Sequence, residues 1–119
     1  MTLLARPQLW RRVFYLLALL TLLLSLLPVA QLPQAFNFWD KAQHALGFAA
    51  LMWAACQGWA RTQRGRLAAW LLAFGALIEL LQHASGWRQG DLLDWLADAM
   101  GVGVGWAASA AWQAFRRRY

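Results

Sequence analysis

The chain has 119 residues, of which 61% are hydrophobic and only 13% are charged, and its formal net charge is +6. Soluble domains are about half apolar and about a quarter charged, so this composition excludes an ordinary soluble domain. A chain this short has too little interior to bury so much apolar surface, and a lipid bilayer is its natural solvent. At about 20 residues for each membrane-spanning helix, the apolar content predicts four spans in a single domain.

Four apolar segments follow one another along the chain. The predicted spans cover residues 13–32, 42–60, 67–86 and 92–115 of the single domain 1–119. The second span holds no Asp, Glu, Lys or Arg, whereas the third contains Glu79 and the fourth contains Asp94 and Asp98. An acid at the centre of a span costs about 3 kcal/mol on insertion scales, so these three acids are expected to be shielded from lipid.

The first apolar segment also has features of a cleavable signal peptide. Basic residues precede its apolar core, and Pro28-Val29-Ala30 ends in a small residue. Proline is a poor residue directly before a cleavage site, and loss of this segment would leave an odd number of helices. We therefore predict that the segment is retained as a span.

The positions of the cations predict the orientation of the spans. Nine of the eleven precede the first span, separate the second from the third, or follow the fourth: Arg6, Arg11, Arg12, Arg61, Arg64, Arg66, Arg116, Arg117 and Arg118. The other two connections hold only Lys41 and Arg88. Short cytoplasmic segments carry the excess of Lys and Arg. We expect an all-α, integral membrane four-helix bundle with both termini in the cytoplasm.

The charge pattern and the cysteine count exclude two classes of site. Arginine clusters at three separate span ends form no continuous basic face, so no nucleic-acid partner is expected. The single cysteine, Cys56, excludes an intramolecular disulfide and a cysteine-based zinc site.

The remaining ionisable groups fall in the outer half of the predicted bundle. His44 lies four residues after Asp40, and His83 lies four residues after Glu79, so each pair shares one helix face. We predict an inward-facing, ligand-binding site formed by Asp40, Lys41, His44, Glu79, Gln82, Arg88, Asp94 and Asp98. Two structural alternatives are ordinary interfacial solvation, favoured for Lys41 and Asp91 taken singly, and an ion-pair network in which Arg88 and Lys41 neutralise Asp94 and Glu79.

A stripe with spacings of three and four continues from these acids along the fourth span. It begins at Asp91, Asp94 and Asp98 and reaches Gly101 and Gly105. One face of this helix is therefore acidic near the start of the span and lacks side chains further along it, at the two glycines. We predict that the two glycines are a helix-packing surface, where a neighbouring helix approaches closely.

Three motifs on three predicted helices occur in a recognisable order. They are Asp40-Lys41-Ala42-Gln43-His44 with Phe48, Glu79-Leu80-Leu81-Gln82, and Arg88 with Asp94, Asp98, Gly101 and Gly105. They resemble the D-K-x-x-H, E-x-x-Q and R…D-x-x-x-N-x-x-G-x-x-x-G motifs of the VanZ-like family of small bacterial membrane proteins. The resemblance spans Asp40 to Gly105, although Asp98 stands where the family usually has Asn, and Asp91 where a small polar residue is more common.

The resemblance implies a fold, a topology and a location in the bacterial cytoplasmic (inner) membrane more than an activity. The namesake of the VanZ-like family is linked to resistance to the glycopeptide teicoplanin, which carries an acyl chain. We favour a site that binds an envelope lipid, a lipid-linked envelope precursor or a lipid-anchored glycopeptide, and so contributes to teicoplanin-type resistance. Arg88 and Lys41 would engage a phosphate or carboxylate, and Asp94 and Asp98 would position these cations or accept hydrogen bonds from hydroxyl donors.

Two other functions stay open beside binding. One is an intramembrane metal-assisted hydrolase or transferase that acts on a lipid or cell-envelope precursor, with Glu79, His83 and Asp94 as the catalytic candidates. Its Zn²⁺ or Mn²⁺ would be held by His44 and His83 together with a carboxylate, but no H-E-x-x-H motif is present, so no cofactor is the favoured expectation. The other is a proton- or ion-coupled carrier, or an assembly partner, in which Glu79 and Asp98 titrate and which requires a homo-oligomer.

Overall fold

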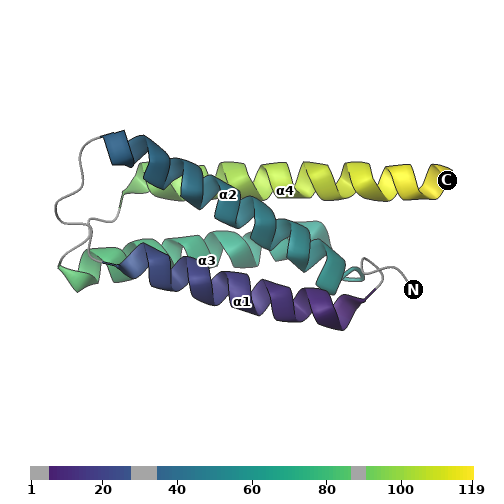
Figure 1. Ribbon diagram of the computed structural model, residues 1–119, viewed down its shortest axis with the longest axis horizontal. Coiled ribbons are helices and arrows are strands. Elements are labelled where there is room, and N and C mark those ends of the chain that lie inside the picture. Colours follow the sequence, from purple (N-terminus) through teal and green to yellow (C-terminus); the bar gives the residue numbers. More distant parts are fainter. Residues whose placement is uncertain (1–5, 28–34, 87–90) are drawn as a thin grey trace.

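The computed structural model describes residues 6–27, 35–86 and 91–119, apart from the side chains of residues 35–40. Within these ranges the chain forms four helices and no strand, as shown in Figure 1. The helices are α1 (Pro7–Leu26), α2 (Ala35–Gly58), α3 (Arg64–Ser85) and α4 (Leu92–Arg118). The prediction of an all-α fold is therefore confirmed. Each predicted span overlaps one helix, although α1 begins and ends about six residues earlier than expected, at Pro7 and Leu26.

Local sequence signals explain several helix ends. Pro7 stands in the first turn of α1, where its fixed φ suits the helix and its missing N–H costs nothing. Helix α3 stops at Gly86, whose φ of 79° lies in the left-handed region that glycine adopts without strain. Asp91 caps α4 by accepting a hydrogen bond of 2.9 Å from the backbone N–H of Leu93.

Successive helices run in alternating directions, so the basic segments gather at one end. In Figure 1 the start of α1, the connection between α2 and α3, and the end of α4 all lie toward the same end of the long axis. The Nε of Arg11 donates a 2.8 Å hydrogen bond to the carbonyl oxygen of Gly58, and Arg64 donates to the side-chain oxygen of Gln113. These contacts tie the helix ends together. The opposite end is called the acidic end below, because it carries the carboxylates of α3 and α4.

Helices α2 and α4 form the closest pair in the bundle. At Gly101 the backbone of α4 lies so near α2 that an added Cβ would overlap the carbonyl oxygen of Ala45. At Gly105 an added Cβ would lie 2.5 Å from the carbonyl oxygen of Ala49. Small residues on both helices therefore let the two backbones touch, which is a recurrent mode of helix association in membranes.

Around its apolar core, the bundle inverts part of the distribution of polar and apolar side chains that a soluble protein has. Five leucines of α1 are each more than half exposed: Leu16, Leu19, Leu20, Leu23 and Leu24. Six polar or charged residues among those described are at least 95% buried: Ser25, His44, Gln82, Asp94, Asp98 and Ser109. Soluble proteins rarely bury aspartate while exposing a continuous leucine surface. This inversion is what a bundle surrounded by lipid would need.

Two of the helices, α1 and α3, are long and apolar enough to cross a membrane. Helices α2 and α4 are also long, at 24 and 27 residues, and both contain ionisable side chains, among them His44 and Asp98. Among the described residues, two helices thus qualify as membrane-span candidates by length and composition. Four spans remain a prediction.

Candidate functional site

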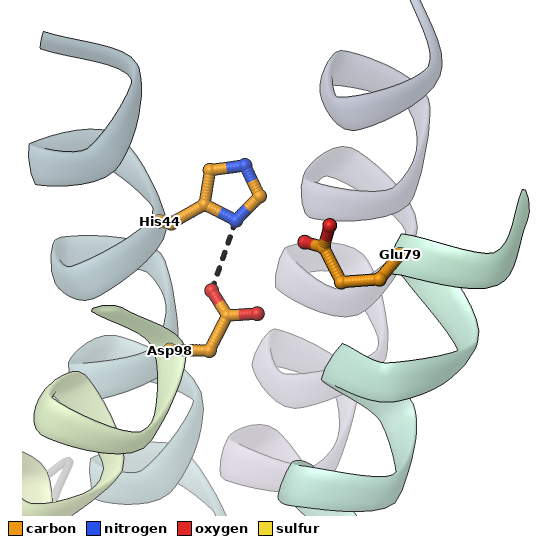
Figure 2. Close-up of side chains that lie close together, drawn as sticks. All are labelled: His44, Glu79 and Asp98. Carbon is orange, nitrogen blue, oxygen red and sulfur yellow. Dashed lines mark hydrogen bonds and ion pairs between the residues drawn. The ribbon is translucent and has the colours of Figure 1, made fainter. Parts of the chain in front are cut away.

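Three ionisable side chains from three helices converge near the acidic end. They are His44 of α2, Glu79 of α3 and Asp98 of α4, and one possible ligand atom from each lies within 4.8 Å of the others. Figure 2 shows the imidazole and both carboxylates directed toward a common space. His44 and Asp98 are buried, whereas Glu79 is partly exposed. Chain topology, not a local motif, assembles this group.

The His44–Asp98 pair is the buried part of the cluster. The Nδ1 atom of His44 lies 2.9 Å from Oδ1 of Asp98, as Figure 2 shows. Asp98 precedes Gly101 by three residues, about one helical turn, so the close contact of α2 with α4 brings the two side chains within reach. On the other side Asp98 packs against Gly75 of α3, where an added Cβ would lie 2.8 Å from its Oδ2 atom. Gly75 therefore leaves the space that the Asp98 carboxylate occupies.

An ion-pair network lies next to the His44–Asp98 pair. Lys41 Nζ is 2.9 Å from Oδ1 of the buried Asp94 and 3.3 Å from Oδ2 of the half-exposed Asp91. The backbone N–H of Asp91 donates a 2.7 Å hydrogen bond to Oε2 of Glu79. The hydrogen bond from Leu93 holds the pKa of the Asp91 carboxyl below its ordinary value, and Lys41 acts in the same direction. Asp91 therefore links all three helices of the site.

The structure brings some of the predicted site residues together and separates others. Lys41, His44, Glu79, Asp94 and Asp98 are joined through the contacts above. Gln82 is fully buried but turns to α1, where its Nε2 atom donates a 2.8 Å hydrogen bond to the carbonyl oxygen of Ser25. His83 is exposed. Arg88 and the side chain of Asp40 lie outside the described residues.

The cluster as described is acidic. Its four carboxylates, those of Glu79, Asp91, Asp94 and Asp98, share it with Lys41 and His44. The Oε1 atom of Glu79 is buried and has no hydrogen-bond partner among the described residues. An acceptor in this state suits a cation or a hydroxyl donor better than an anion.

A second feature, not expected from the sequence, lies toward the basic end. A groove of about 550 Å³ is lined by residues of α1, α2 and α3, among them Phe14, Trp59, Arg66 and Trp70. Arg11 lies over the ring of Trp59, with 5.4 Å between its guanidinium carbon and the ring centroid. The groove contains no residue of the acidic cluster. Its shape depends on the angles between helices, which no motif in the chain encodes.

Comparisons with protein-family models, with curated proteins and with solved structures found no match. The likeness to the VanZ-like family rests on the three motifs alone. Any function for the acidic cluster must therefore be argued from its own chemistry.

Proposed function

We propose that this chain is a four-span protein of the bacterial cytoplasmic membrane, with its basic end in the cytoplasm and its acidic end at the outer face. The acidic cluster binds the polar headgroup of an envelope lipid, a lipid-linked precursor or a lipid-anchored glycopeptide. The main support is the convergence of buried and partly buried ionisable groups from three helices at the end opposite the arginines. Ionisable groups inside membrane domains are costly and are retained chiefly for function.

The contacts divide the recognition tasks among the residues. Lys41 already forms ion pairs with Asp91 and Asp94. Arg88 therefore binds the phosphate or carboxylate of the ligand, because a guanidinium can bind either group in a bidentate manner. Glu79 lies partly exposed and offers a free acceptor oxygen for a hydroxyl of the headgroup. If the VanZ-like resemblance extends to function, the ligand is of the teicoplanin type and binding contributes to resistance.

Replacement of Arg88 by alanine tests this proposal. The variant should insert and fold normally but bind the lipid-anchored glycopeptide or precursor at least about tenfold more weakly, because a charge-assisted bidentate contact contributes about 1.5–3 kcal/mol. Binding can be measured by titration of purified protein in lipid nanodiscs, with Arg116→Ala at the opposite end as the matched control. Equal affinity of the Arg88 variant and wild type would refute this role of Arg88 and the proposed recognition.

Topology can be tested separately with fusions of alkaline phosphatase, which is active only outside the cytoplasm. A fusion after Tyr119 should be inactive, and a fusion after Gly90, between α3 and α4, should be active, because the cation excess fixes the basic end inside. A fluorescent-protein fusion after Tyr119 should be bright. Phosphatase activity after Tyr119 would contradict the proposed orientation.

A metal-assisted hydrolase or transferase is a second candidate, favoured by one observation. The carboxylate of Asp98 contacts one nitrogen of His44 directly beside Glu79, and a carboxylate in this position orients an imidazole for acid–base work or metal binding. The binding experiment separates the two candidates. Recovery of intact lipid supports binding alone, whereas accumulation of a cleaved product supports catalysis.

A further inference from the structure

We propose that His44, Glu79 and Asp98 form a binding site for one divalent transition-metal ion, Zn²⁺ or Mn²⁺. The residues come from α2, α3 and α4, so the ion would hold α2 against α3 and α4 at this end. The proposal concerns the ion alone and holds whether or not the cluster also binds a lipid headgroup.

The geometry is close to that of a metal site. Zn²⁺ binds His nitrogen and carboxylate oxygen at about 2.0–2.2 Å, so two of its ligand atoms in a tetrahedral site are about 3.3–3.6 Å apart. His44 Nδ1 and Asp98 Oδ1 are 2.9 Å apart, and the three ligand atoms all lie within 4.8 Å of one another. Movements of about 1 Å by flexible side chains would bring all three onto a single ion. An ion on Nδ1 would displace any proton held there.

Charge favours a cation at the same point. Two carboxylates, those of Glu79 and Asp98, face each other across the space drawn in Figure 2, while the nearby Lys41 contacts Asp91 and Asp94. Like charges at this separation repel strongly where the surroundings are apolar. A divalent ion would neutralise both carboxylates and supply a partner for the buried Oε1 atom of Glu79.

The ligand set selects among metals. Ca²⁺ takes six to eight oxygen ligands, and Mg²⁺ keeps several waters in an octahedron of oxygens, so an imidazole in the set disfavours both. One imidazole with two carboxylates suits Zn²⁺ or Mn²⁺. Three protein ligands leave a coordination position for a water molecule or an oxygen of a bound molecule. The hydrogen bond from the Asp91 backbone to Oε2 of Glu79 holds that carboxylate in place, as an outer-shell contact does in metal sites.

Metal analysis of the full-length protein tests the proposal. The protein is purified in detergent without a polyhistidine tag, and bound metal is then removed with a chelator that is itself removed. The metal-free protein is titrated with Zn²⁺ or Mn²⁺, and bound metal is measured by mass spectrometry. Wild type should bind about one ion per chain, and His44→Ala and Glu79→Gln should each weaken binding by at least about tenfold. Glu79→Gln preserves size and removes a charge, so it remains informative if His44→Ala misfolds.

His83→Ala is the matched control, because His83 follows Glu79 by one turn but is exposed. It should bind the ion as wild type does, and excess Ca²⁺ should not compete. Less than about one ion per ten chains in wild type, or wild-type affinity in both site variants, would overturn the proposal. Equal loss in His83→Ala would overturn this ligand assignment. Because no lipid ligand is present, the outcome is independent of the Arg88 experiment.

Discussion

Alanine at Gly101 is expected to destabilise the bundle by about 3 kcal/mol, the upper part of the usual range for overpacking. The added Cβ would overlap the carbonyl oxygen of Ala45, which is backbone and cannot rotate away, so α2 and α4 would have to separate. Gly105→Ala should act in the same direction at Ala49. Unfolding in mixed detergent micelles, followed by loss of helical circular dichroism, measures the effect.

Gly103 provides the matched control on the same helix. An added Cβ there meets nothing within 4 Å, because the position faces away from α2. Gly103→Ala should therefore leave stability unchanged or raise it by up to about 1 kcal/mol, since alanine favours the helical state more than glycine does. If Gly101→Ala and Gly103→Ala have the same free energy of unfolding, α2 and α4 do not make the direct backbone contact described here.

Replacement of His44 by alanine is expected to lower the free energy of unfolding by about 3 kcal/mol, even when a chelator removes any metal. His44→Ala deletes the hydrogen-bonded partner of Asp98, whose side chain is fully buried, and a buried polar pair loses most when only one member is removed. The double variant His44→Ala/Asp98→Ala should be no less stable than His44→Ala alone. Unfolding curves of the two single variants, the double variant and wild type give the coupling energy directly.

His83→Ala is again the appropriate comparison, because it removes the same side chain from an exposed position of the neighbouring helix. A loss below about 0.5 kcal/mol is expected there. Strictly additive losses in the His44 and Asp98 cycle would mean that the two side chains do not interact in solution.

Helix number and direction could be predicted because they depend on averages over many residues. A largely apolar run of about 20 residues with few charges marks each helix, and the arginine clusters mark helix ends. The spacing of Gly101 and Gly105 also indicated a packing face, since only small side chains permit backbones to meet. The partner helix could not be predicted, because nothing in the stripe specifies that Ala45 and Ala49 lie opposite.

The contacts within the site could not be predicted, because they depend on the rotation and relative depth of the helices, which the spacing of residues in the sequence does not determine. Glu79 and His83 share a face by the rule of four, yet the rotation of α3 about its axis leaves His83 exposed and turns the adjacent Gln82 toward Ser25. A rotation of a few tens of degrees decides between these outcomes. The pairing of Lys41 with Asp94 and of His44 with Asp98 likewise follows from the relative depth of α2 and α4, which is set by the glycine contact.

The backbone contact at Gly101 also makes the crossing point of α2 and α4 a pivot. Asp94 lies seven residues from Gly101, or about 10 Å at 1.5 Å per residue, so a change of about 5° in crossing angle would move it by about 1 Å relative to α2. Such a motion would stretch the Lys41–Asp94 ion pair first and the deeper His44–Asp98 pair less. The spacing between α2 and α4 at the acidic cluster therefore depends on their crossing angle, and the Lys41–Asp94 ion pair opposes an increase in that spacing.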